Sequence, residues 1–277
     1  MALPAGFTFS QASLQDYSDC PRRFQLRYVQ NVRWPAADAE PSTWEKGAQQ
    51  GAAFHRLVHQ HTVGIPEAAL RETITDPELR VWWQAYLDTP PLNLPTEVRR
   101  SEVRLSVPLN GYRLMARYDL LAIAPGQRAV IVDWKTSKRR AERGLLANRW
   151  QTRVYRYVLV NAAEELNGQR ELYPKQVELV YWFTNYPQQT ECLPYDASQY
   201  AADQLAIQTA VTEIAGRDTV RDQEQWTLTN DLKRCRYCTY RTLCDQDLVE
   251  APEPDWEPQE ESEDWEIDLE QIGEIAF

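Results

Sequence analysis

The sequence predicts an α/β fold in which a mixed β-sheet is flanked by helices, and two observations carry that prediction. Three stretches rich in branched and aromatic residues follow one another between residues 103 and 134, with turn signals between them. Stretches with apolar residues at helical spacing lie on both sides of this block. The chain has 277 residues, 43% of them hydrophobic, which suffices for one large domain with a substantial core.

Each element is predicted from a local pattern. Before the strands, helical spacing of apolar residues predicts helices at residues 13–29, 47–61 and 77–87. Asn110-Gly111 is a strong signal for a two-residue hairpin, and Pro125-Gly126 marks the next turn. After the strands we expect a helix at 150–166, strands at 176–184 and near 190–193, and a long helix from 198 to about 215.

Two aspartates are predicted to meet across the second hairpin. Asp119 and Asp133 are equidistant from Gly126, so antiparallel pairing would place their Cβ atoms about 5 Å apart. Facing carboxylates repel, and a bound Mg²⁺ or Mn²⁺ would remove that repulsion. Strand alternation puts Lys135 on the face of Asp133. This combination suits phosphodiester hydrolysis, because a metal lowers the pKa of bound water and an ammonium group stabilises charge on phosphate.

The flanking helices offer further groups. His55 and His59 share a helix face one turn apart, so one of them could complete a metal site. Arg56 stands where a zinc protease with the H-E-x-x-H motif needs Glu, which excludes that class. Gln151 and Tyr155 are also one turn apart, and could either position nucleic acid and the catalytic strand or belong to ordinary helix surface and core.

Taken in order, these motifs resemble the PD-(D/E)XK nuclease superfamily in its RecB-like branch. The matching pieces are His55 in G-x-x-x-H, Glu102 in EVRLSV, Asp119 in RYDLL, Asp133-Trp134-Lys135 as D-x-K, and Gln151 with Tyr155 as Q-x-x-x-Y. The resemblance implies a restriction-endonuclease-like fold.

The resemblance also implies a role for each matching residue. Mg²⁺ or Mn²⁺ would be bound by His55, Asp119, Asp133 and the Trp134 carbonyl. Lys135 would be catalytic, Gln151 and Tyr155 would form the supporting motif, and Glu102 would lie behind the first metal ligands or at a second metal. Arg117 departs from the pattern, because relatives often have Gly two residues before the aspartate; this could alter how substrate approaches.

Four of the five cysteines form a second candidate centre. Cys235, Cys238 and Cys244 are close in sequence, and Cys20 precedes Pro21 near the other end of the chain. Four thiolates suit a four-iron four-sulfur cluster or zinc. The arrangement resembles the iron-sulfur members of the RecB-like group, among them CRISPR-adaptation nucleases and AddB-type nuclease domains. That resemblance favours iron-sulfur over zinc and would join both ends of the fold. We expect Cys192 to be an unpaired thiol packed against a strand.

Charge is distributed unevenly along the chain. Eleven of the 41 acidic residues lie in residues 251–277, which contain no Lys or Arg, so the preceding 250 residues carry as many bases as acids. A run of bases follows the D-x-K motif and is expected to contact nucleic acid; the alternative is a solvated helix face. Its members are Lys138, Arg139, Arg140, Arg143, Arg149, Arg153 and Arg156.

The chain is expected to consist of a nuclease domain, residues 1–250, and an acidic tail, residues 251–277. The tail is either a disordered solubilising segment or a segment that docks on a protein partner or on the protein's own basic channel. The chain shows neither a signal peptide nor a long apolar span, which predicts a cytoplasmic protein that does not cross a membrane.

Two functions remain open at this stage. The first is a metal-dependent DNA nuclease, an exonuclease or end-processing enzyme, acting on single-stranded DNA or free ends in repair, recombination or CRISPR spacer acquisition. The second is a non-catalytic scaffold subunit that binds nucleic acid and retains the fold and the cysteine cluster. The intact set of Asp119, Asp133 and Lys135 favours the nuclease.

Overall fold

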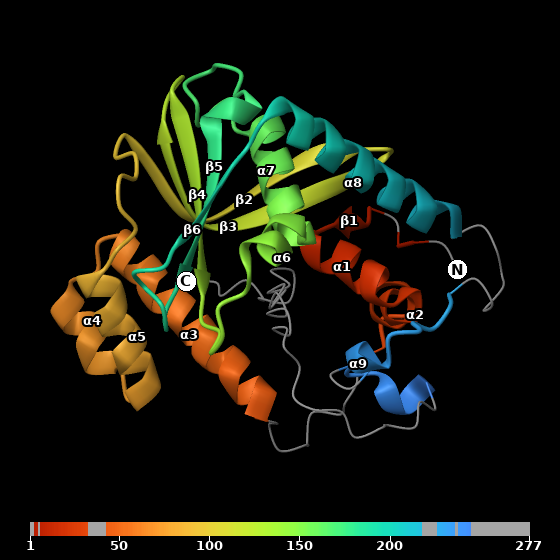
Figure 1. Cartoon of the computed structure of the whole chain (residues 1–277), viewed down its shortest axis with the longest axis horizontal. Helices are drawn as coiled ribbons and strands as arrows, with labels where there is room; N and C mark the ends of the chain where they lie inside the picture. Colours follow the sequence, from red (N-terminus) through yellow and green to blue (C-terminus); the bar gives the residue numbers. More distant parts are fainter. Residues whose placement is uncertain (1–2, 5, 33–42, 218–225, 236–237, 245–277) are drawn as a thin grey trace, which may run out of the picture.

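A mixed sheet of six strands forms the centre of the computed structural model, which describes residues 3–4, 6–32, 43–217, 226–235 and 238–244 (Figure 1). The strands are β1 (Thr8–Phe9), β2 (Val98–Leu109), β3 (Tyr112–Ala124), β4 (Arg128–Lys135), β5 (Val177–Phe183) and β6 (Glu191–Pro194). β2 pairs antiparallel along β3. The other edge of β3 pairs with β1 in parallel near one end and with β4 antiparallel near the other. β5 then pairs in parallel with β4 and antiparallel with β6.

Both predicted hairpin turns are present. Asn110 and Gly111 have φ values of 48° and 84°, as a two-residue turn with two left-handed positions requires. The second turn spans Pro125 to Gln127, with Gly126 at φ 76°, and Ala124 pairs with Arg128 across it. The register predicted from the position of Gly126 is therefore confirmed.

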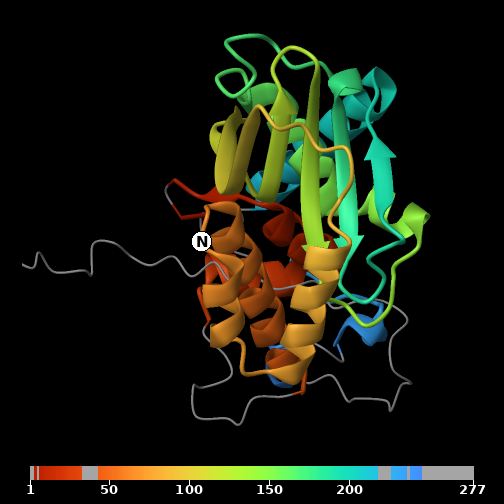
Figure 2. The ribbon, with the colours of Figure 1, turned by 90° about the vertical axis from the view of Figure 1, so that its left-hand side faces the viewer.

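Helices cover both faces of the sheet. The described helical segments are α1 (Gln11–Asp19), α2 (Pro21–Phe24), the π-helical η1 (Gln25–Val29), α3 (Thr43–Thr62), α4 (Glu67–Thr73), α5 (Pro77–Asp88), α6 (Arg143–Asn148), α7 (Trp150–Ala162), the 3₁₀ turn η2 (Pro174–Gln176), α8 (Ala197–Arg217), α9 (Leu232–Cys235) and the 3₁₀ turn η4 (Arg241–Cys244). In Figure 2, α3, α4 and α5 form a group near one end of the strands.

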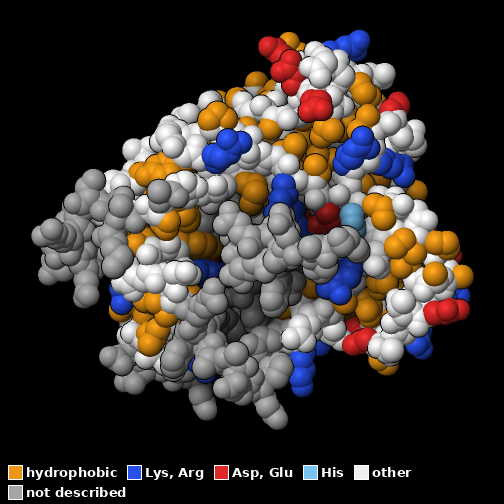
Figure 3. All heavy atoms as spheres, turned by 180° about the vertical axis from the view of Figure 1, so that it is seen from behind, with side chains coloured by type: hydrophobic (Ala, Val, Ile, Leu, Met, Phe, Trp, Pro, Cys, Tyr) orange, Lys and Arg blue, Asp and Glu red, His pale blue; other side chains and the backbone are white. Residues whose placement is uncertain are grey.

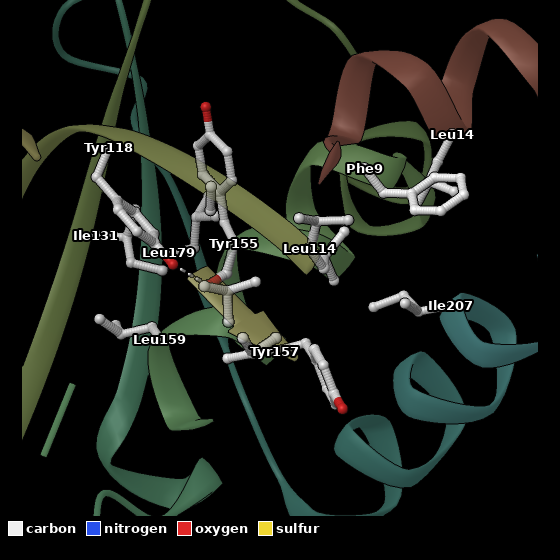
Figure 4. Close-up of a cluster of buried hydrophobic side chains, with 14 of the residues drawn as sticks. Phe9, Leu14, Leu114, Tyr118, Ile131, Tyr155, Tyr157, Leu159, Leu179 and Ile207 are labelled. Atoms are coloured by element: carbon white, nitrogen blue, oxygen red, sulfur yellow. Dashed lines mark hydrogen bonds between the residues drawn. The ribbon is translucent and has the colours of Figure 1, made fainter. Parts of the chain in front are cut away.

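Strand alternation divides the core into two parts. Ile131 of β4 packs with α7 and α8, whereas Val130, Val132 and Trp134 pack with Phe54 and the other apolar residues of α3 to α5. Figure 4 shows the first part, in which the ring of Tyr155 on α7 lies beside Tyr118 on β3. The Tyr118 hydroxyl donates a hydrogen bond to the Tyr155 carbonyl (2.9 Å), which fixes α7 against the sheet.

Several predicted elements differ in detail. The first predicted helix is interrupted at Cys20, which has extended backbone angles, because Pro21 disfavours helical geometry in the residue before it. The short elements β1, α4 and α6 were not predicted. Cys192 lies on the edge strand β6 with an exposed thiol, because Leu193 takes the buried position there, so the predicted packing against a strand is wrong.

Trp226 and α9 lie against the N-terminal helices, as the positions of α9 and α2 in Figure 1 show for α9. Trp226 stacks on Phe24 with ring centroids 5.7 Å apart, and the Arg22 backbone N–H donates to the Thr227 carbonyl. The two ends of the described chain therefore meet. The predicted acidic tail lies outside the described residues, and no described helix is long and apolar enough to cross a membrane.

Candidate active site

The candidate site lies where β3 and β4 diverge. Their pairing runs from Ala124 and Arg128 to Leu120 and Val132, and Asp119 and Asp133 are the next residues on the two strands. Beyond this point β4 continues beside β5 as far as Lys135. An oxygen of the Asp119 carboxylate accepts a hydrogen bond from the Trp134 backbone N–H (2.9 Å), so this side chain satisfies a donor at the fork.

β2, which pairs with the opposite edge of β3, is also distorted where Glu102 lies opposite Asp119. The two strands pair on both sides of this point: Ser101 pairs with Leu120, and Val103 pairs with Tyr118. Glu102 itself has φ 55°, a left-handed conformation that costs a non-glycine residue roughly 1–2 kcal/mol. The kink brings the Glu102 carboxylate to the fork.

His55 of α3 completes a group of possible metal ligands. Its Nδ1 is 3.3 Å from an Asp119 oxygen, and its Nε2 is 3.1 Å from the Trp134 carbonyl oxygen. One ligand atom each from His55, Glu102 and Asp119 lie within 4.8 Å of one another. His59 instead contacts the Ser101 hydroxyl (2.7 Å).

Gly51 lets α3 approach the end of β4. A Cβ atom built on Gly51 would lie 3.0 Å from Oγ1 of Thr136, the residue after Lys135. Gly51 and His55 are one turn apart and share a helix face. The close approach at Gly51 therefore sets the position of the His55 ring.

Lys135 is held in place by a hydrogen-bond network. Its ammonium group lies 2.9 Å from an Asp133 oxygen and donates to the Gln151 side-chain oxygen (3.0 Å). The Gln151 amide nitrogen donates to the other Asp133 oxygen (2.8 Å) and to the Tyr155 hydroxyl (3.3 Å). The Lys135 side chain is 7% exposed and that of Asp133 is 2% exposed, so the pair is shielded from water.

The electrostatics of the site keep Asp119 charged and keep Tyr155 neutral. Burial alone would raise the pKa of Asp119, but His55, the Trp134 N–H and Lys135 together hold that pKa below its ordinary value. Burial raises the pKa of Tyr155 well above its ordinary value, and the negative charges of Asp133 and Asp119 raise it further. Tyr155 therefore stays protonated at neutral pH.

Tyr181 of β5 belongs to the site and was missed by sequence analysis. The Lys135 nitrogen lies 5.4 Å from the centre of the Tyr181 ring, in cation–π geometry. The Tyr181 hydroxyl shares a hydrogen bond with the Thr152 hydroxyl (2.7 Å). Burial and Asp133 raise the pKa of Tyr181 to about 12. The available signal was strand alternation, because Tyr181 pairs with Asp133 in the parallel β4–β5 ladder.

The predicted run of bases does not form one continuous stripe. Lys138 and Arg139 are exposed just beyond Lys135. Arg140 and Arg143 form ion pairs with Glu191. Arg149 immediately precedes the first turn of α7. Arg153 stacks over Trp150 and hydrogen-bonds Asn148. The prediction that Arg156 contacts nucleic acid is wrong. Arg156 is only 3% exposed and pairs with Asp203 of α8 (3.0 Å), so it cannot contact nucleic acid.

Figure 3 shows a His side chain beside an acidic group on one face of the molecule, with Lys and Arg side chains around them.

The four cysteines of the second predicted centre line one cavity. Cys20 comes from the junction of α1 and α2, and Cys235, Cys238 and Cys244 come from α9, the following loop and η4. Burial raises the pKa of Cys238 to about 11. Burial, together with the neighbouring Cys20 and Cys244, also raises the pKa of Cys235. Arg23, Arg234 and Arg241 line the same cavity.

The sequence model of the PD-(D/E)XK nuclease superfamily matches residues 8–245. The chain belongs to the PD-(D/E)XK nuclease superfamily. The match includes every residue of the candidate site, and the mixed sheet flanked by helices agrees with the restriction-endonuclease-like fold expected from the sequence.

Solved structures with a similar chain path have low sequence identity. A proposed exonuclease from Eubacterium rectale is 9% identical with a TM-score of 0.49, and the match covers 88% of this chain and 90% of that one. The crystal structure of SSO0001 is 14% identical with a TM-score of 0.38, and the match covers 87% of each chain. No curated protein matches the sequence significantly.

Proposed function

We propose that this member of the PD-(D/E)XK nuclease superfamily is a metal-dependent DNA nuclease of the RecB-like branch that degrades or trims DNA ends. One observation carries the proposal. At the fork between β3 and β4, the Asp119 carboxylate and His55 lie beside a buried Lys135 that is positioned by Asp133 and Gln151. Acidic groups, a histidine and an oriented ammonium group are the components that metal-assisted phosphodiester hydrolysis requires.

The donor set fits Mg²⁺ or Mn²⁺. His55, Asp119 and the Trp134 carbonyl would hold the ion, with Glu102 as a further carboxylate ligand. Asp133, which the sequence predicted as a ligand, lies outside the group of ligand atoms within 4.8 Å of one another, and its two oxygens contact Lys135 and Gln151. Carboxylate and carbonyl oxygens are ligands that both ions accept, and imidazole is better tolerated by Mn²⁺. When bound, the ion would acidify a water molecule and offset charge on the phosphate.

The protein's own groups supply orientation and charge. Lys135 would donate a hydrogen bond to a non-bridging phosphate oxygen or orient the attacking water. Gln151 accepts from Lys135 and donates to Asp133, so the amide fixes both at once. Tyr155 is held neutral by burial and accepts from the Gln151 amide, which fixes the orientation of that amide.

DNA is the substrate that the resemblance and the surrounding charge favour. Lys138 and Arg139 are exposed directly after the catalytic strand, and with Arg140, Arg149 and Arg153 they are our proposed contacts to the phosphate backbone. Single-stranded DNA or free ends, and a place in repair, recombination or CRISPR spacer acquisition, follow from the resemblance to RecB-like nucleases.

The test compares two lysines on the same segment. Lys135→Gln should abolish Mn²⁺-dependent cleavage of end-labelled DNA while the thermal unfolding temperature changes little. Lys138→Gln should leave the maximal rate unchanged and raise KM modestly, more so at low salt. Full cleavage by Lys135→Gln would overturn the assignment of this site as the nuclease centre. Absence of Mn²⁺-dependent cleavage by the wild-type protein would favour the alternative, a non-catalytic scaffold subunit that binds nucleic acid.

We further propose that Cys20, Cys235, Cys238 and Cys244 hold a four-iron four-sulfur cluster. Their convergence on one cavity supports this, and three arginines at the cavity offset the negative charge of four thiolates. Such a cluster would close a loop of more than 200 residues and stabilise residues 1–250 as one domain. Four thiolate ligands need a reducing compartment, so we place the protein in the cytoplasm.

Metal analysis of anaerobically purified protein tests the cluster. We expect a brown protein with close to four iron atoms per chain. A colourless protein with one zinc per chain would show that zinc occupies the site. Cys20→Ser should lower iron content and thermal stability, whereas Cys192→Ser, with its exposed thiol on β6, should change neither.

A further inference from the structure

Three carboxylates at the candidate site each face one basic side chain. Asp133 pairs with Lys135 (2.9 Å), Asp119 with His55 (3.3 Å) and Glu102 with Arg117 (2.7 Å). The first two pairs are accounted for by the proposed metal and lysine roles. The third pair is not.

Arg117 is placed to meet the substrate. The side chain of Arg117 is 41% exposed, whereas that of Lys135 is 7% exposed, so Arg117 is the more accessible of the two cations. Its bond to Glu102 uses Nε, and within the described residues the two terminal NH₂ groups remain as donors for a second oxygen anion. A guanidinium group in this arrangement binds phosphate oxygens well.

The neighbouring strand adds a second arginine. Arg104 of β2 is directly opposite Arg117 in the register, and Arg104 is exposed. Like charges facing each other across a sheet destabilise it unless an anion lies nearby. Glu102 supplies one such anion to Arg117, and a DNA phosphate would supply another.

The charge count agrees with this arrangement. Three carboxylates, Lys135 and Arg117 carry a net charge of minus one when His55 is neutral, as a metal ligand must be. A divalent ion changes the sum to plus one, which matches the single negative charge of a phosphodiester. The site would then attract phosphate only after the metal has bound.

We propose that Arg117 neutralises Glu102 while the metal is absent and binds a non-bridging oxygen of the DNA phosphate once the metal engages Glu102. This inference rests on the proposed nuclease function. It makes two predictions of opposite sign for removal of the guanidinium. Metal binding should become tighter, because Glu102 loses a competing cation, and DNA cleavage should become slower.

Mn²⁺ titration of the full chain without DNA, followed by the electron paramagnetic resonance signal of free Mn²⁺, measures the first effect. Arg117→Gln should bind Mn²⁺ roughly two- to fivefold more tightly, the worth of one partly exposed ion pair. Arg117→Lys, which keeps the charge, should stay closer to wild type. Arg113→Gln is the matched control, because Arg113 is exposed on the same strand and face but contacts Ser106.

Cleavage at saturating Mn²⁺ measures the second effect. Arg117→Gln should be about tenfold slower or more, as expected for a lost charge-assisted hydrogen bond to phosphate, and Arg113→Gln should match wild type. Weaker or unchanged Mn²⁺ binding by Arg117→Gln would overturn the proposal, since a residue that only positions Glu102 gives that result. Tighter Mn²⁺ binding with unchanged cleavage would overturn the phosphate role.

Failure of the proposed nuclease function gives a different result. In that case the wild-type protein shows no Mn²⁺-dependent cleavage of DNA, whatever Arg117→Gln does to Mn²⁺ binding.

Discussion

Replacement of Gly51 by alanine should uncouple α3 from the catalytic strand. The added Cβ would lie 3.0 Å from Oγ1 and 3.9 Å from Cβ of Thr136. Carbon and oxygen atoms pack at about 3.5 Å or more, so the helix and the strand must separate by about 0.5 Å. His55, one turn further along α3, would move away from Asp119 and the Trp134 carbonyl by a similar amount.

The expected free-energy change combines two opposing terms. Alanine in place of glycine within a helix stabilises by roughly 0.5–1 kcal/mol, and overpacking destabilises by about 1–3 kcal/mol. The net effect on the free energy of unfolding should lie between no change and a loss of about 2.5 kcal/mol. The rate of cleavage should fall more steeply, by about tenfold, because an error of 1 Å in a site can cost about a hundredfold.

Gly47→Ala is the matched control. Gly47 lies one turn earlier on α3, and a Cβ atom there would meet no atom within 4 Å. This variant should gain the helix-propensity term alone, with cleavage unchanged. Both variants would be compared by urea unfolding and by the initial rate of Mn²⁺-dependent cleavage. If Gly51→Ala matches Gly47→Ala in both measurements, the close approach at Thr136 does not position His55 and the reasoning is refuted.

Three further predictions concern charge and packing. The pKa of Asp119 is lowered in the folded state, so the contribution of Asp119 to metal-free stability should be present above about pH 4 and disappear as pH falls through the lowered pKa. The free energy of unfolding of Asp119→Asn should therefore fall less steeply at acid pH than that of wild type, and identical pH profiles would contradict this. Tyr181→Leu should slow cleavage several-fold, because it removes the ring that contacts Lys135. Tyr181→Phe should retain cleavage and lose about 1 kcal/mol of stability with the hydrogen bond to Thr152. Equal cleavage rates for the two variants would exclude a role of the ring contact in cleavage. Deletion of residues 251–277 should tighten DNA binding at low salt if the acidic tail competes with DNA, and the difference should shrink as salt rises. Unchanged DNA binding together with loss of a bound protein partner would indicate a docking segment. No change in either measurement would indicate a solubilising tail.

Local patterns in the sequence were enough to predict the central hairpins and the face of Lys135. Strand alternation and two turn signals specify which residues lie opposite one another, and these are short-range properties. The long helices α3, α5, α7 and α8 were predicted within a few residues of their ends for the same reason.

Other parts of the site depend on contacts between distant segments. Arg156 was placed among the DNA contacts because its burial depends on Asp203, 47 residues later in the chain. The pairing of Glu102 with Arg117 depends on a left-handed backbone in the middle of a strand, which residue type does not predict. Tyr181 reaches Lys135 only through the parallel β4–β5 pairing, whose crossover includes α7.

The position of the bound metal is the most direct test of the central claim, that a nuclease metal site lies at the fork between β3 and β4. Anomalous diffraction from crystals grown with Mn²⁺ would locate the ion. We predict a peak within bonding distance of His55, Asp119 and the Trp134 carbonyl in wild type, and no peak there in Asp119→Asn. A crystal of active protein whose Mn²⁺ peak lies elsewhere, or is unaffected by Asp119→Asn, would contradict the account.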